Sequence, residues 1–319
     1  MMSLRSLSVA LAIVVLGLLT FAVAGRLLYP FELEWMEGAT VVHVSRLLSG
    51  HSIYVRPSLE FVPFGYPALY YYLCLPIAWL IGSGFTALRI VSIGATVATL
   101  VATYAIVGRR SGAAAGLIAA GLFAGAYPLS DGWYDLGRVD ALYVSLLAGV
   151  YLVAARASSL ASWAACGLLA GAAFAAKQPA ALAVAPLGLY LLLTNWRGAV
   201  AFGGTFVAVS AGTLLVMNTA TDGWYAYYVV ELPRLRMAVS PRGGRALSFW
   251  TEDLLPVWPA LAAGLAAVLM TREWRHAAMI AGLIGSGWIA RLEGGAWNNA
   301  VMPAYFAAAV LLGLSLQQG

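Results

Sequence analysis

Charged side chains are scarce in this sequence. They account for 10% of its 319 residues, hydrophobic residues account for 62%, and the chain has a single lysine, Lys177. This composition excludes the ordinary soluble globular classes and indicates a polytopic helical membrane protein. The net charge of +5 therefore does not point to nucleic acid, because basic residues in such proteins serve topology or bind anionic ligands.

Cysteine is also rare. The two cysteines, Cys74 and Cys166, both lie inside apolar runs. Since a disulfide framework needs several paired cysteines in an extracytoplasmic domain, this placement implies none.

The N-terminal apolar segment resembles a signal peptide, because Arg5 precedes it and Ala22-Val23-Ala24-Gly25 resembles a cleavage site. However, the run from Leu7 to Ala24 is about 18 residues long, and the apolar core of a signal peptide usually has roughly 7–15. We therefore expect a first helix that is retained in the membrane.

Long apolar runs predict an all-α polytopic membrane protein that forms one domain over residues 1–319. The run 161–194 must hold two helices, because a single helix would be roughly 50 Å long and the bilayer core is about 30 Å thick. Lys177-Gln178-Pro179 supplies the break, since proline is tolerated where a helix starts. We expect about ten transmembrane helices, near residues 7–28, 86–107, 113–129, 140–155, 161–176, 179–194, 199–218, 255–270, 276–291 and 301–317.

The run from Tyr66 to Gly82 is ambiguous, because it is apolar but contains Pro76 and four tyrosines. If it crossed the membrane, every later loop would change side. If it lies in the outer leaflet, the short arginine-bearing loops all share the cytoplasmic side with Arg5, as the positive-inside tendency prefers. We therefore predict an external, juxtamembrane helical loop here. The loop arginines are Arg109, Arg110, Arg156, Arg197, Arg272 and Arg275.

This placement gathers twelve of the thirteen carboxylates on the extracytoplasmic face and leaves Glu273 on the other. Asp-Gly-Trp-Tyr occurs twice on that face, at 131–134 and 222–225, and indicates interfacial turns. Four arginines in the loop 219–253 fall there too, and could bind a phosphate or anionic lipid headgroups. These are Arg234, Arg236, Arg242 and Arg245.

Acids, a lysine, arginines and aromatic side chains at a membrane surface together suit chemistry on a lipid-linked phosphate. A carboxylate can deprotonate an acceptor hydroxyl, and cations can stabilise the phosphate that leaves. Each residue also has a purely structural explanation. Glu34 and Glu37 could lie in a solvated loop, Asp140 could cap a helix for roughly 1 kcal/mol, and Lys177 could be an interfacial anchor.

Several short motifs follow one another in an order that resembles the GT-C superfamily of polyprenyl-phosphate-sugar-dependent glycosyltransferases. The layout is closest to glycosyltransferase family 39, which includes protein O-mannosyltransferases and the lipid A aminoarabinose transferase. The resemblance extends from Leu7 to about Leu314. The motifs are Met36-Glu37-Gly38, the segment Ser45 to Gly50, Tyr54, Phe64-Gly65-Tyr66-Pro67, Arg138-Val139-Asp140, Phe174 to Pro179, and Asn298-Asn299 before Met302-Pro303.

The resemblance implies catalytic roles for three carboxylates. The family's base is typically the first acid of a pair, but Met36 occupies that place here, so Glu37 or Glu34 must serve, and we favour Glu37. Asp140 matches an acid that orients the substrate or helps hold a divalent metal. Whether a metal is required stays open, and no other cofactor is implied.

The resemblance also implies a set of substrate-binding residues. Phe174 to Pro179 is similar to the family's threonine-lysine-glycine-proline element, with Ala176 and Gln178 as departures. Asn298 or Asn299 would hydrogen-bond a sugar or phosphate, or would only start a helix. His43 and His51 are assigned no role. The expected binding set is Arg138, Lys177, Arg234, Arg236, Tyr66 and Asn298.

We therefore predict an inverting glycosyltransferase of the bacterial inner membrane with an extracytoplasmic active face. It would pass a sugar from a polyprenyl-phosphate carrier to a hydroxyl or amine of a protein, lipid or glycan. Two other classes stay open. A transporter or flippase would be expected to show inverted repeats, and we see none in the sequence. A non-catalytic scaffold of the same fold is kept open by the missing acid at Met36.

Overall fold

The computed structural model describes residues 3–239 and 243–316, and all regular secondary structure in these residues is helical. This confirms the all-α fold class. Helices occur at each of the ten predicted apolar runs. They are α1 (Leu4–Leu27), α4 (Phe85–Ser111), α5 (Ala113–Gly125), α6 (Val139–Ala154), α7 (Leu160–Ala176), α8 (Ala180–Thr194), α9 (Trp196–Ala220), α13 (Trp258–Met270), α14 (Trp274–Arg291) and α15 (Met302–Ser315).

The lengths of these helices bear on how many cross the membrane. Six helical segments in the described part of the chain are long and apolar enough to cross a bilayer, and four further apolar helices, among them α6, α7 and α8, are shorter. The chain is therefore a multi-pass membrane protein, and the figure of ten spans stays a prediction.

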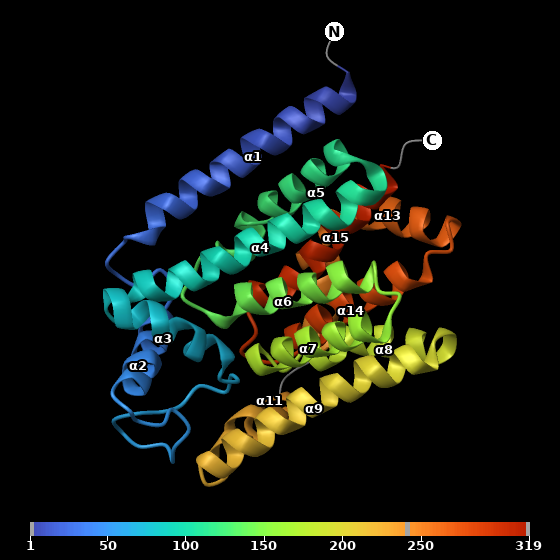
Figure 1. Ribbon diagram of the computed structural model, residues 1–319. Helices are drawn as coiled ribbons and strands as arrows, with labels where there is room; N and C mark the ends of the chain where they lie inside the picture. Colours follow the sequence, from blue (N-terminus) through green and yellow to red (C-terminus); the bar gives the residue numbers. More distant parts are fainter. Residues whose placement is uncertain (1–2, 240–242, 317–319) are drawn as a thin grey trace.

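α15 lies inside the bundle, whereas α1 and α9 lie at its edges (Figure 1). In the segment Asn298–Ser315, most of which is α15, 83% of the residues are buried, against 11% in the most apolar stretch of α1 and 6% in that of α9. α9 packs closely on α7 at Gly167 and Gly171, where an added Cβ would collide with Phe202 and Val209. Small residues at such contacts are typical of membrane helices, which associate largely through close packing.

Two shorter helices follow α1 in the sequence, α2 (Glu37–Leu48) and α3 (Leu69–Ile81), and they lie at one end of the bundle near the start of α4 (Figure 1). At 1.5 Å per residue α3 is about 20 Å long, which is too short for a core of about 30 Å. The N–H of Gly137, just before α6, donates to Glu37 Oε1 at 2.7 Å. The predicted juxtamembrane run therefore does not separate Glu37 from Asp140, and both lie at the same end of the bundle.

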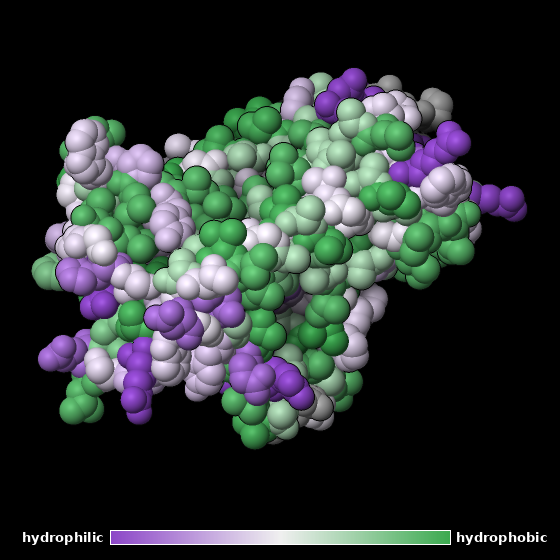
Figure 2. Space-filling model, turned by 60° about the horizontal axis from the view of Figure 1, so that its bottom comes forward, coloured by the Kyte–Doolittle hydropathy of each residue, from purple (hydrophilic) through white to green (hydrophobic). Residues whose placement is uncertain are grey.

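The opposite end of the bundle carries arginines of the short loops, as the charge pattern predicted. Arg110 pairs there with Glu273 at 2.5 Å, and Arg275 donates to the carbonyl oxygens of Ala154 and Ala157 at 3.1 and 3.3 Å. Figure 2 shows hydrophilic side chains gathered toward the two ends of the molecule, with a largely hydrophobic surface between them.

Both copies of Asp-Gly-Trp-Tyr form the same kind of turn. Asp131 and Asp222 have φ angles of 52° and 50°, and the glycines after them have φ angles of 72° and 89°. Glycine and aspartate tolerate this left-handed backbone better than other residues. The repeat therefore marks two equivalent turns, as its sequence predicted.

The segment 219–253, expected to be a loop, is largely helical in its described residues. We call its first part, Trp224–Val239, the strap. The strap consists of α10 (Trp224–Ala226), the π-helical turn η2 (Tyr227–Glu231) and α11 (Leu232–Val239). α12 (Gly243–Ser248) and a second π-helical turn, η3 (Phe249–Asp253), follow it.

Candidate active site

Arg138 is the centre of one polar group at the α2–α3 end of the bundle. It immediately precedes α6 and is 2% exposed. Its Nη1 donates to Glu34 Oε2 at 2.7 Å, and its Nη2 donates to the Tyr66 hydroxyl at 3.1 Å. The guanidinium also lies 4.9 Å from the ring centroid of Trp133. A guanidinium bound on several sides fixes the segments of Glu34 and Tyr66 against the start of α6.

Glu34 is held through only one of its carboxylate oxygens. Its Oε2 accepts hydrogen bonds from Arg138 and, at 3.1 Å, from the N–H of Met36. Within the described residues no hydrogen bond reaches its Oε1, and the side chain is 12% exposed. A positioned carboxylate with one oxygen available to accept a proton meets the geometric requirement for a general base.

Asp140 is the centre of a second polar group, in the first turn of α6. Lys177 Nζ lies 2.5 Å from its Oδ1, and Asn299 Nδ2 donates to the same oxygen at 2.9 Å. Its Oδ2 is buried and has no hydrogen-bond partner among the described residues. Lys177 is extended, with φ −156° and ψ 132°, and lies between α7 and α8. The predicted helix break is thus confirmed, and it places the only lysine of the chain on Asp140.

The structure brings five of the predicted site residues together, since Arg138 and Asp140 are two positions apart and link the two polar groups. These five are Glu34, Tyr66, Arg138, Asp140 and Lys177. Asn298 is not among them, because its Nδ2 donates to Asp131 in an exposed contact of 2.7 Å. The alternative, Asn299, is 8% exposed and points inward from the turn η5 (Asn298–Val301).

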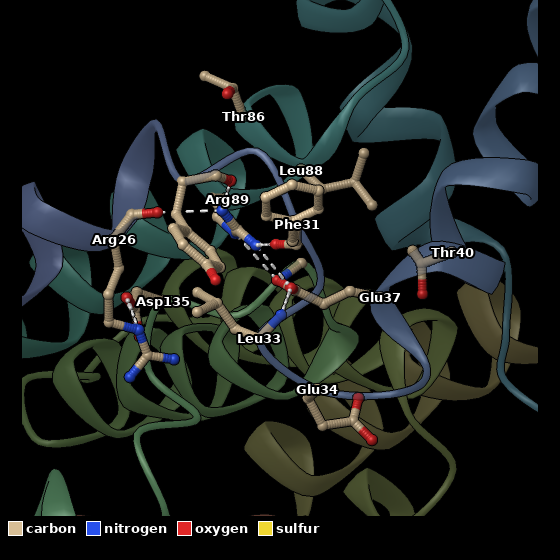
Figure 3. A network of polar contacts seen from close by, with 12 residues as sticks. Arg26, Phe31, Leu33, Glu34, Glu37, Thr40, Thr86, Leu88, Arg89 and Asp135 are labelled. Carbon is tan, nitrogen blue, oxygen red and sulfur yellow. Dashed lines mark hydrogen bonds and ion pairs between the residues drawn. The ribbon is translucent and has the colours of Figure 1, made fainter.

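Glu37 has a different environment from Glu34 (Figure 3). Its side chain is 0% exposed, and Arg89 Nε and Nη2 donate to its two oxygens at 3.1 and 2.8 Å. The N–H groups of Leu33 and Gly137 donate to it at 2.8 and 2.7 Å. Each oxygen therefore accepts two hydrogen bonds, which leaves Glu37 little capacity to take a proton from a substrate. This geometry favours Glu34 over Glu37 as the base.

Two of the arginines that organise this end of the bundle, Arg26 and Arg89, were not anticipated from the sequence. Arg89 Nη1 donates to the carbonyl oxygens of Arg26 and Tyr29 at 3.0 and 2.6 Å, and its Nη2 donates to that of Phe31 at 2.8 Å. Arg89 and Arg26 both fall inside predicted membrane spans. Since ionisable residues within such spans are rare and usually functional, their position was a signal that could have identified them.

Arg26 also contacts a third acid of this end, Asp135. The two side chains pair at 3.2 Å, and the Tyr127 hydroxyl donates to Asp135 Oδ1 at 3.0 Å. Burial raises the pKa of Asp135 above its ordinary value, although the charge of Arg26 opposes this effect. Arg26, Arg89 and Arg138 thus each hold a different carboxylate at this end.

The arginines predicted to bind phosphate lie on or near the strap. Arg234 and Arg236, on α11, have side chains that are 81% and 58% exposed, and they lie 3.7 Å from Glu231 and Glu293 respectively. Arg245 donates to the carbonyl oxygen of Glu293. Arg242 lies outside the described residues. A role for Arg234 and Arg236 in phosphate binding therefore stays a prediction.

A metal at Asp140 would need further oxygen ligands. The described residues contain no cluster of three His, Cys, Asp or Glu side chains suited to a metal ion. Asp140 is bonded instead to an ammonium and an amide group. This set of donors does not fit a carboxylate-bound divalent metal.

Known proteins share this fold. The model of the family described as dolichyl-phosphate-mannose-protein mannosyltransferase matches residues 66–221. The crystal structure of ArnT from Cupriavidus metallidurans bound to undecaprenyl phosphate covers 95% of this chain with a TM-score of 0.72 and 14% sequence identity. The chain has the fold of ArnT. The structure of the same ArnT in the apo state agrees, with a TM-score of 0.72 and 15% identity, and the fold that the resemblance in the sequence implied is confirmed.

The chain spans 59% of the length of these ArnT structures. No curated protein sequence matches it. These comparisons therefore show the fold of the chain and not its substrates.

Proposed function

We propose that this chain transfers a sugar from a polyprenyl-phosphate carrier to an acceptor hydroxyl or amine. The observation that carries the proposal is the joined pair of polar groups, Glu34 with Arg138 and Asp140 with Lys177. It places a carboxylate with an available oxygen beside buried cations, at one end of a membrane bundle. The undecaprenyl phosphate bound to ArnT and the dolichyl-phosphate-mannose family model support the same class of donor here.

Glu34 acts as the general base in this proposal. Its Oε1 takes the proton of the acceptor hydroxyl while the acceptor oxygen attacks the anomeric carbon of the sugar. As that bond forms, the bond between the anomeric carbon and the phosphate oxygen breaks, and its electron pair leaves with the polyprenyl phosphate. A single displacement of this kind inverts the configuration at the anomeric carbon.

Lys177 and Arg138 stabilise the negative charge that develops on the departing phosphate. Both are more than nine-tenths buried, and a cation in a site shielded from water stabilises such charge more strongly than an exposed one. Asp140 holds Lys177 in place and offers its second oxygen to the substrate. Arg234, exposed on α11, provides a further cation at the membrane surface.

The distribution of arginines supports one orientation of the protein in the membrane. We propose that the end with the loop arginines faces the cytoplasm of a bacterium and that the end with Glu34 faces outward from the inner membrane. Arginines in short loops prefer the cytoplasmic side. A carrier flipped to the outer leaflet would then present its sugar to Glu34.

Incubating the purified wild-type protein with a panel of radiolabelled polyprenyl-phosphate sugars tests this proposal. We expect label to move to an acceptor with inverted configuration and unglycosylated carrier to appear in equal amount. Movement of the carrier between leaflets of a reconstituted vesicle, without transfer of label from any donor, would support a flippase instead.

A further inference from the structure

Gln178 joins three segments that lie far apart in the sequence. It follows Lys177 in the break between α7 and α8. Its Nε2 donates to the carbonyl oxygen of Gly65 at 2.7 Å and to that of Val229 at 3.1 Å. An amide nitrogen carries two hydrogens, so both donors of this side chain are used. One points toward the segment that joins α1 to α4, which we call the first loop, and one points toward the strap.

The contact with Gly65 leads directly to the site. Gly65 precedes Tyr66, whose hydroxyl accepts the hydrogen bond of Arg138. A Cβ on Gly65 would lie 3.2 Å from the carbonyl oxygen of Tyr228 in η2, so the first loop and the strap are in close contact here. Gln178 is therefore next to Lys177 in the sequence, and it binds Gly65, which is next to Tyr66.

The contact with Val229 supplies a hydrogen-bond donor to a carbonyl oxygen whose usual α-helical donor is missing from the strap. The α-helical partner of the Val229 oxygen would be the N–H four residues later. That position is Pro233, which has no N–H, and η2 at this point has a π-helical backbone. The proline therefore removes a donor from the strap, and the carboxamide of Gln178 supplies one.

We infer that Gln178 is a positioning residue that keeps Lys177 on Asp140 by fixing the α7–α8 break to the first loop and to the strap. A glutamine suits this task because two carbonyl oxygens must be bound by one neutral side chain that carries two donor hydrogens. The inference rests on the proposed function, since it concerns the cation that meets the leaving phosphate.

The test combines Gln178→Ala with Lys177→Met in the full-length protein. Two readouts are measured, binding of radiolabelled undecaprenyl phosphate and kcat/KM for the polyprenyl-phosphate sugar. We expect Gln178→Ala to lower both by about tenfold, the effect of losing two hydrogen bonds. Gln178→Glu should lower them further, because a carboxylate oxygen would face two carbonyl oxygens. In a Lys177→Met background, Gln178→Ala should have no further effect, because the group it positions is gone.

Asn218→Ala is the matched control. Asn218 Oδ1 accepts the N–H of Ala226 at 3.0 Å, so this variant also removes a side-chain contact to the strap, but not one that reaches Lys177. We expect it to change both readouts by less than about twofold, within the range of ordinary single substitutions away from a site. Thermal unfolding of each variant shows whether it is folded.

The outcomes separate the two proposals. If the effects of Gln178→Ala and Lys177→Met multiply, or if Asn218→Ala equals Gln178→Ala, Gln178 serves only to anchor the strap and the inference is overturned. If the wild-type protein neither transfers sugar nor binds the carrier, the proposed function itself is overturned, and the inference with it.

Discussion

Arg89 donates one hydrogen bond to each carboxylate oxygen of Glu37, and neither side chain is exposed. The two residues are 52 positions apart and join the start of α2 to α4. Because Glu37 also accepts the N–H groups of Leu33 and Gly137, this pair fixes the first loop at the place where it carries Glu34. The pair therefore holds in place the segment that carries Glu34.

Breaking this pair should act on stability. Removing one partner of a buried ion pair leaves an uncompensated charge and typically costs about 3–5 kcal/mol. We expect Arg89→Met to lower the free energy of unfolding by about that amount, measured by thermal or denaturant unfolding in detergent. A variant with wild-type stability that has lost sugar transfer would show that Arg89 acts in catalysis.

Variants of the Asp140–Lys177 pair should separate an effect on carrier affinity from an effect on kcat. Lys177→Met removes the cation that we propose meets the leaving phosphate, so we expect the affinity for undecaprenyl phosphate to fall by tenfold or more, which corresponds to about 1.4 kcal/mol. Asp140→Asn keeps a side-chain oxygen that can accept from Lys177, so carrier affinity should fall by less than in Lys177→Met, while kcat falls because no carboxylate oxygen is offered to the substrate. Equal losses of carrier affinity in the two variants would contradict a phosphate contact by Lys177.

Asn298 and Asn299 form a matched pair for a third test. Asn299 donates to Asp140, whereas Asn298 donates to Asp131 in an exposed contact. We expect Asn299→Ala to lower kcat/KM for the sugar donor by about tenfold, as loss of a hydrogen bond to a charged group would. Asn298→Ala should leave it within about twofold of wild type. A larger loss in Asn298→Ala than in Asn299→Ala would contradict the assignment of Asn299 to the site.

His43 is neutral in the folded protein. Its Nδ1 donates to the carbonyl oxygen of Ala39 at 2.6 Å, and its Nε2 accepts the N–H of Phe64 at 3.0 Å. Burial lowers its pKa from 6.5 to about 4, and the nearby charge of Arg46 adds to this effect, although the Ala39 hydrogen bond opposes it. The imidazole thus ties α2 to the segment before Tyr66.

This buried histidine predicts a pH dependence of stability. Between pH 6.5 and about 4 the unfolded chain binds a proton at His43 and the folded chain does not, so stability falls as pH falls through this window. The loss from this residue amounts to at most about 3 kcal/mol. Unfolding of His43→Gln, measured across the same window, should show a shallower dependence. An unchanged slope in the variant would refute this assignment.

Features with a local physical cause could be predicted from the sequence. The break at Lys177 follows from the length of an apolar run compared with the thickness of a bilayer and from the proline beside it. The short, non-crossing α3 followed from the distribution of loop arginines. In the first case the deciding residues are neighbours in the sequence. In the second, the positions of the loop arginines are compared over the whole chain.

Features that depend on a particular pair of side chains could not be predicted. Glu34 and Glu37 lie three positions apart in similar surroundings, and only the fold shows that Arg89 faces one and Arg138 the other. Likewise, Asn298 and Asn299 are adjacent, and only the fold shows that Asn299 is the one that reaches Asp140. The sequence identifies these residues, but it does not show which of two nearby residues faces a given partner in the fold.

The most direct measurement compares sugar transfer by Glu34→Gln and Glu37→Gln, with the same radiolabelled donor and with the unfolding of both proteins recorded. Loss of a general base typically lowers the rate by about 10²–10⁴-fold. We expect such a loss of kcat for Glu34→Gln at wild-type stability, and a clear loss of stability for Glu37→Gln. Wild-type turnover by a folded Glu34→Gln protein would contradict the assignment of Glu34 as the general base.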